Sequence, residues 1–95
     1  MRLAIEMAVI EIEDEITAVA AGKDRAKFHG MLRLNESAAD IIRLLAEDIT
    51  LKELFDAICE KYPDSDREEV GNMLGNFLNR LNKEGLLIDD DDDLV

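Results

Sequence analysis

The sequence predicts an α+β domain of the winged helix-turn-helix type, in which a three-stranded antiparallel sheet is followed by three helices. Segments rich in β-branched and apolar residues are confined to the first third of the chain, and apolar residues recur at helical spacing after it. The 95 residues suit one small domain. We expect this domain to span residues 1–88, and the acidic tail 89–95 to be disordered.

The first two strands are predicted at about Met7–Ile12 and Ile16–Ala21, on either side of a Glu13-Asp14 turn. Helix is the competing interpretation, because Ala, Glu and Met are common there. The isoleucines flanking the short turn favour a hairpin. A third strand is predicted from Phe28 to Leu34, where Gly30 allows a bulge or a close backbone approach.

Helices are predicted for most of the remaining chain. Asn35 is a good N-cap for a helix from about Ser37 to Ala46. Thr50-Leu-Lys-Glu53 and Ser65-Asp-Arg-Glu68 have the form of capping boxes, so they predict the starts of two more helices. Pro63 ends the second helix and Gly85 the third, and residues 86–88 are expected to pack back as a short extended segment.

The charge of the chain limits the classes of partner. The net charge is −12, which disfavours contact with phosphate backbones. Four basic residues and one acid lie between Lys23 and Arg33, so this segment is a basic island that either solvates a loop or receives an acidic partner. There is no secretory signal and no apolar run long enough to span a membrane, so we expect a cytoplasmic protein without membrane contact.

Residues suited to catalysis or metal binding are scarce. The chain has one histidine, His29, and one cysteine, Cys59, with no nucleophile motif and no metal-ligand spacing. Cys59 is expected to be a small buried residue. The aspartate run from Asp89 to Asp93 lacks the glycine and spaced ligands of a calcium loop. The sequence therefore predicts neither an enzyme nor a metal or cofactor site.

Three segments resemble the PqqD-like family, whose members are also called RiPP recognition elements. They are Gly30-Met-Leu-Arg-Leu-Asn-Glu-Ser-Ala-Ala39, Thr50-Leu-Lys-Glu-Leu-Phe55, and Asn76-Phe-Leu-Asn-Arg-Leu81 with Gly85-Leu-Leu after it. A turn glycine that often precedes the second helix in the family is replaced here by Glu47-Asp48. The resemblance covers about residues 7–88. It implies a non-catalytic protein that binds the leader of a ribosomally made precursor peptide and presents it to a modifying enzyme, often a radical S-adenosylmethionine enzyme.

The resemblance also implies where the leader binds, as an added strand beside the third strand and against the third helix. The residues independently favour this site, because the third strand of a meander is an edge. Met and Phe suit an adaptable apolar groove, and Arg33 and Arg80 can pair with acidic leader side chains. The expected peptide-binding residues are Phe28, Gly30, Met31, Leu32, Arg33, Leu34, Met73, Asn76, Phe77 and Arg80.

Several alternatives stay open at this point. Met73 and Phe77 are also suited to an ordinary core. A winged helix-turn-helix protein can bind DNA. The predicted third helix, however, has three basic and four acidic residues, and its net negative charge repels the phosphate backbone of DNA. The exposed edge strand also suits a dimerisation module, so both monomer and homodimer stay open.

Overall fold

The computed structural model describes residues 1–26 and 30–88. Phe28, His29 and the tail 89–95 lie outside the described residues, so the predictions made for them stay predictions. The elements are β1 (Arg2–Leu3), β2 (Met7–Ile12), β3 (Glu15–Ala20), the 3-10 turn η1 (Gly22–Asp24), β4 (Met31–Leu34), α1 (Glu36–Leu44), α2 (Leu51–Lys61), α3 (Arg67–Lys83) and β5 (Leu87–Ile88).

The three-stranded antiparallel sheet has the predicted order, β2-β3-β4. The hairpin is confirmed, with Ile12 paired to Glu15 across the Glu13-Asp14 turn. In β3 and β4, Thr17 pairs with Arg33 and Ile16 with Leu34. Within the described residues, the third strand is shorter than predicted, because regular pairing begins at Met31 and Gly30 precedes it.

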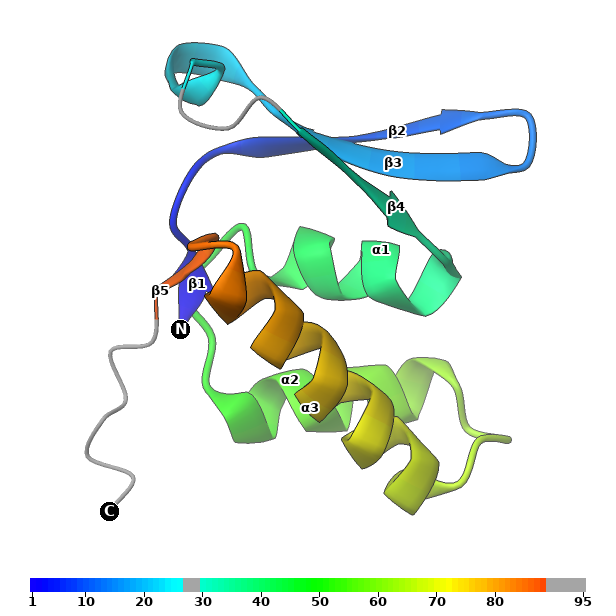
Figure 1. Cartoon of the computed structure of the whole chain (residues 1–95). Coiled ribbons are helices and arrows are strands. Elements are labelled where there is room, and N and C mark those ends of the chain that lie inside the picture. The colour runs from blue at the N-terminus through cyan, green and yellow to red at the C-terminus, as the bar shows by residue number, and fades with distance from the viewer. Residues whose placement is uncertain (27–29, 89–95) are drawn as a thin grey trace.

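Helix α1 lies between this sheet and the helices α2 and α3 (Figure 1). Side chains alternate along each strand, so one face of the sheet, including Ala18 and Leu32, is buried against the helices. Ile41 and Ile42 of α1, together with Leu45, have almost no exposed surface. The core continues beneath α1 through the buried side chains of α2 and α3, which are Leu54, Ile58, Val70, Leu74, Phe77 and Leu81.

The helix starts follow two of the three predicted caps. The Asn35 side chain accepts a hydrogen bond from the Ala38 amide at 2.8 Å, and Thr50 and Glu53 form the predicted capping box. The prediction that Ser65 caps the third helix is wrong. Helix α3 begins one residue later than predicted, and its N-cap is Asp66, whose side chain accepts a hydrogen bond from the Glu68 amide. Aspartate in this position offers a charged acceptor to the first turn, which favours it over the neighbouring serine.

A second, two-stranded sheet joins the ends of the domain. Its C-terminal strand, β5, confirms the short extended segment that was predicted at residues 86–88, whereas β1 and its pairing with β5 were not predicted. β1 pairs antiparallel with β5, as Leu3 with Leu87. The chain reaches β5 through a tight reversal after α3, in which Gly85 has a positive φ of 73°. The Gly85 amide donates to the Asn82 carbonyl and the Leu86 amide to the Leu81 carbonyl, which is the Schellman pattern. The predicted C-terminal stop at Gly85 is therefore confirmed.

None of the helices in residues 1–26 and 30–88 is both long and apolar enough to cross a membrane. In the same residues, no three His, Cys, Asp or Glu side chains gather closely enough to hold a metal ion.

We predict opposite effects from alanine at two glycines of this region. Gly85→Ala should lower the free energy of unfolding by about 1 kcal/mol, because a Cβ disfavours the positive φ. Gly75→Ala, inside α3 with open space around the new Cβ, should raise it by about 0.5–1 kcal/mol. Urea unfolding measures both, and changes of the same sign would contradict this account of the reversal.

Candidate functional site

Strand β4 has a free edge within the described part of the chain. It pairs with β3 on one side, and no described strand lies on the other. The free edge of such a strand offers unpaired amides and carbonyls in extended geometry. The edge is held in place because β4 ends at Leu34 and α1 begins at Glu36, with the Asn35 cap between them.

The side chains of β4 alternate between the core and solvent. Leu32 is buried and Leu34 is half-buried on the inner face, whereas Met31 is 64% exposed on the outer face. Ile10 and Ile12 of β2 are also exposed on this outer face, at 40% and 66%. The outer face of the sheet is therefore partly apolar and open to solvent.

Arg33 has a partner within the protein, although the sequence suggested a side chain free to meet a ligand. Its guanidinium donates to the Glu15 carboxylate on the neighbouring strand. Both side chains are exposed, so the pair contributes little stability. It does, however, neutralise one charge of the predicted basic island.

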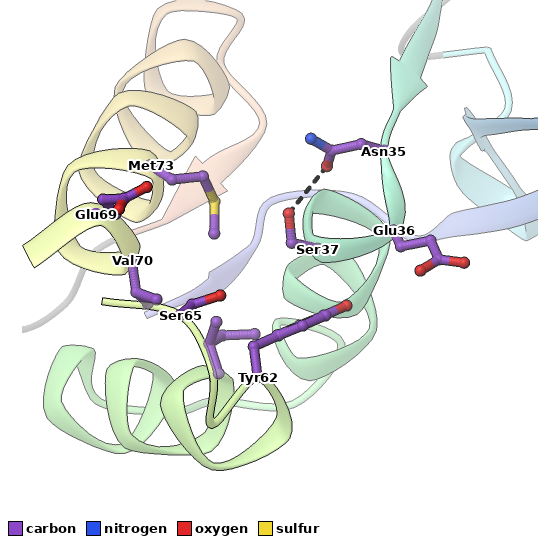
Figure 2. A pocket seen from close by; sticks show the side chains of 9 residues that line it. Asn35, Glu36, Ser37, Tyr62, Ser65, Glu69, Val70 and Met73 are labelled. Carbon is purple, nitrogen blue, oxygen red and sulfur yellow. Dashed lines mark hydrogen bonds between the residues drawn. The ribbon is translucent and has the colours of Figure 1, made fainter. Parts of the chain in front are cut away.

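A cleft of about 500 Å³ opens next to the end of β4. Figure 2 shows its two walls, with Met73, Val70 and Glu69 of α3 on one side and Asn35 and Ser37 on the other. The end of α2 and the connection after it close the remaining side. The full lining is Asn35, Glu36, Ser37, Ile58, Tyr62, Ser65, Glu69, Val70 and Met73. The cleft thus combines apolar and polar side chains, as small-ligand and peptide sites do.

A buried carboxylate joins two walls of this cleft. Asp40 of α1 is only 7% exposed. It accepts hydrogen bonds from the Tyr62 hydroxyl, which lines the cleft, and from Lys61 Nζ at 2.9 Å. Arg43 lies 3.4 Å away along α1 and also 3.6 Å from Glu11 of β2. These contacts fix the end of α2 against α1, and both of these elements line the cleft.

The same contacts shift the pKa values of both partners. Burial alone would raise the pKa of Asp40, but the hydrogen bonds from Tyr62 and Lys61, with the Lys61 and Arg43 charges, outweigh it and lower this pKa. The hydrogen bond to Asp40, reinforced by burial and by the Asp40 charge, raises the pKa of Tyr62 to about 12. Tyr62 is therefore a neutral hydrogen-bond donor at physiological pH.

The structure brings only part of the predicted site together. Met73 lines the cleft, whereas Phe77 is buried in the core with 8% exposure. Asn76 and Arg80 are exposed on α3, one and two turns beyond Met73. Cys59 is half-buried and packs against the core. Whether the predicted residues bind a peptide stays a prediction.

Sequence reasoning missed the second half of the cleft. Tyr62, Ser65 and Glu69 line it, as do Asn35 and Ser37, which the sequence indicated only as helix-start residues. A signal for Tyr62 existed, because it is the one tyrosine in the chain and lies directly before the helix-ending Pro63. Its partner Asp40 gave no signal, since an aspartate in a helix is ordinarily exposed.

The fold and the β4 edge together define a small α+β domain of winged helix-turn-helix layout, in which no described strand lies on one side of β4. A family model described as "Coenzyme PQQ synthesis protein D (PqqD)" matches residues 7–87. The chain therefore belongs to the PqqD family, as the sequence segments indicated.

Comparison with solved structures agrees with this assignment. The chain is similar to a structure titled "TbiB1 in Complex with the TbiA(beta) Leader Peptide", with a TM-score of 0.66 and 29% sequence identity. The match covers 94% of this chain and all of the other. No curated protein matches the chain.

We predict that Tyr62→Phe alters stability in a pH-dependent manner. Loss of the hydrogen bond to Asp40 should lower the free energy of unfolding by about 1 kcal/mol at pH 7. The folded state favours the neutral phenol, so this contribution is present below about pH 10, the pKa of free tyrosine. It is lost as the pH rises to about 12. The difference between wild type and variant should therefore shrink over this window in urea unfolding; a constant difference would contradict the assignment.

Proposed function

We propose that this protein binds the leader segment of a ribosomally made precursor peptide and presents the peptide to a modifying enzyme. The observation that carries the proposal is the open edge of β4, which ends beside the α1–α3 cleft. Membership of the PqqD family and the likeness to TbiB1, which was solved with a leader peptide, support it.

In this proposal the leader adds to the sheet as a fourth strand beside β4. The main chain of Met31–Leu34 supplies hydrogen bonds of the kind that extend a sheet, and these bonds are independent of the peptide sequence. Alternate peptide side chains then point to opposite faces of the sheet. One set projects toward α3, where it meets side chains that can discriminate between sequences.

The cleft supplies the apolar part of this recognition. Ile58, Val70 and Met73 contribute to its lining, and a methionine wall adapts to side chains of different shape. Ser37 and Ser65 offer hydroxyl groups beside these apolar residues. A leader with one apolar side chain flanked by polar ones fits this lining.

The protein itself supplies no chemistry in this account. It holds the leader, and a separate enzyme, which we propose to be a radical S-adenosylmethionine enzyme, acts on the rest of the precursor. Ribosomal peptide and enzyme would meet it in the cytoplasm. We favour peptide binding over DNA binding because Glu68 and Glu69 are exposed at the start of α3, where they repel phosphates.

Strand addition can be tested with backbone-methylated peptides. We predict that a leader peptide of a precursor encoded beside the gene shifts the NMR signals of the Met31–Leu34 amides and of α3. In an added strand, every second peptide amide points toward β4 and the others point away from it. Methylating the nitrogens that point toward β4 should weaken binding at least tenfold, because those amides donate hydrogen bonds to β4, and methylating the others should weaken it much less.

Two outcomes would contradict this proposal. One is that no leader moves the β4 or α3 signals. The other is that both methylated registers bind as well as the parent peptide. Concentration-dependent dimerisation that consumes the β4 edge would favour the competing prediction of a dimerisation module, and light scattering of the free protein measures it.

A further inference from the structure

One stripe along α3 carries opposite charges at its two ends. Glu69, Met73, Asn76 and Arg80 follow one another at spacings of four, three and four residues, so they lie along the same side of the helix. Met73 and Glu69 line the cleft, which places this stripe on the side of α3 that faces the end of β4 (Figure 2). The core residues Val70, Leu74 and Leu81 lie on the neighbouring side.

The end of the stripe near the start of α3 is acidic. Glu69 lies beside Met73 in Figure 2, and Glu36 lines the opposite wall with its carboxylate turned away from the cleft. The described residues that line the cleft include no lysine or arginine. Neither the Glu36 nor the Glu69 carboxylate has a hydrogen bond or an ion pair with another described residue. Glu69 is therefore an acidic side chain of the cleft wall that no described residue pairs.

The other end of the stripe is basic. Arg80 is exposed in the last turns of α3, with Lys83 one turn beyond it. In residues 1–26 and 30–88, Arg80 forms no ion pair. This differs from Arg33, which Glu15 already neutralises. A guanidinium that no described residue pairs, on the side of the helix that faces the β4 edge, is suited to a peptide carboxylate.

We propose that the peptide bound beside β4 carries a basic residue that meets Glu69 and an acidic residue that meets Arg80. This inference rests on the proposed function and adds the charge pattern and direction of the peptide. Glu69 and Arg80 are eleven positions apart along the helix, or about 16 Å, which an extended peptide spans in about five residues.

The direction follows from the arrangement of β4 and α3. These two elements run in opposite directions in Figure 1. All pairings within the three-stranded sheet are antiparallel, and an antiparallel strand added to β4 would run in the direction of α3. The basic residue of the peptide therefore precedes the acidic residue.

The test uses a display library of random 14-residue peptides, selected against the full-length protein. We expect enriched sequences with Lys or Arg about five positions before Asp or Glu. When the Glu69→Lys variant is the target, the selected peptides should lose the preference for a basic residue. When the Arg80→Glu variant is the target, they should lose the preference for an acidic residue. A representative enriched peptide should bind each variant about three- to tenfold more weakly.

Two variants serve as charge-matched controls. Glu68→Lys alters the same helix turn and the same helix dipole as Glu69→Lys, but Glu68 does not line the cleft. Lys52→Glu changes the net charge as Arg80→Glu does, on the exposed surface of α2. Both controls should bind the representative peptide as tightly as the wild type does.

The outcomes separate this inference from the proposed function. Enriched peptides that shift the NMR signals of β4 support the peptide site. If the charges of these peptides are random or reversed in order, or if their binding is unchanged in the two variants, the proposed charge pattern is wrong although the peptide site stands. Weakening of equal size in the controls would also overturn the pattern, because it would reflect net charge alone. If no peptide that contacts β4 is enriched, the proposed function fails and the inference fails with it.

Discussion

The Asn35 cap is the constraint on which the rest of the site depends. It ends β4 and begins α1 with a single residue between the two elements, and its side chain satisfies the Ala38 amide at the helix start. A longer connection would let β4 tilt away from the helices. With one residue, the buried face of α1 fixes the strand in space. A strand edge held this rigidly loses little further entropy when a partner adds to it.

The second constraint is the contact between Asp40 and Tyr62. A buried carboxylate is costly unless it is paired, and this one receives donors from Tyr62 and Lys61. Because these donors come from the end of α2 and the carboxylate from α1, the pairing holds two elements of the cleft at a fixed separation. The α3 wall is attached to α2 separately, through Arg67, which lies over the Phe55 ring and near Asp56. The cleft is thus shaped by polar contacts at its base and by the core behind it.

Much of the fold could be predicted from local signals in the sequence. The hairpin, the strand-to-helix corner at Asn35, the Thr50 capping box and the Gly85 reversal depend on neighbouring residues, and the structure confirms all four. The extended segment at residues 86–88 was predicted, but its pairing with β1 was not, because two-residue strands from opposite ends of the chain leave no periodic pattern. The start of α3 was misplaced by one residue because Ser65 and Asp66 are both good caps.

The site was predictable only where it coincides with an element edge. The free edge of β4 follows from strand order, which the sequence indicated. The cleft depends on the hydrogen bond from Tyr62 to Asp40, which lies twenty-two positions earlier in the chain. Residue spacing within one helix or strand does not predict contacts between residues so far apart. The pairing of Arg33 with Glu15 has the same origin, since it follows from the register of β3 and β4.

The central claim is that β4 accepts a peptide as an added strand, and amide hydrogen exchange tests it most directly. Exchange would be followed at Met31–Leu34 with and without a saturating leader peptide. The account predicts that the amides of β4 that β3 leaves unpaired become protected on binding, while those of β2 change little. Tight binding with unchanged exchange in β4 would show that the peptide occupies another surface, and would contradict the account.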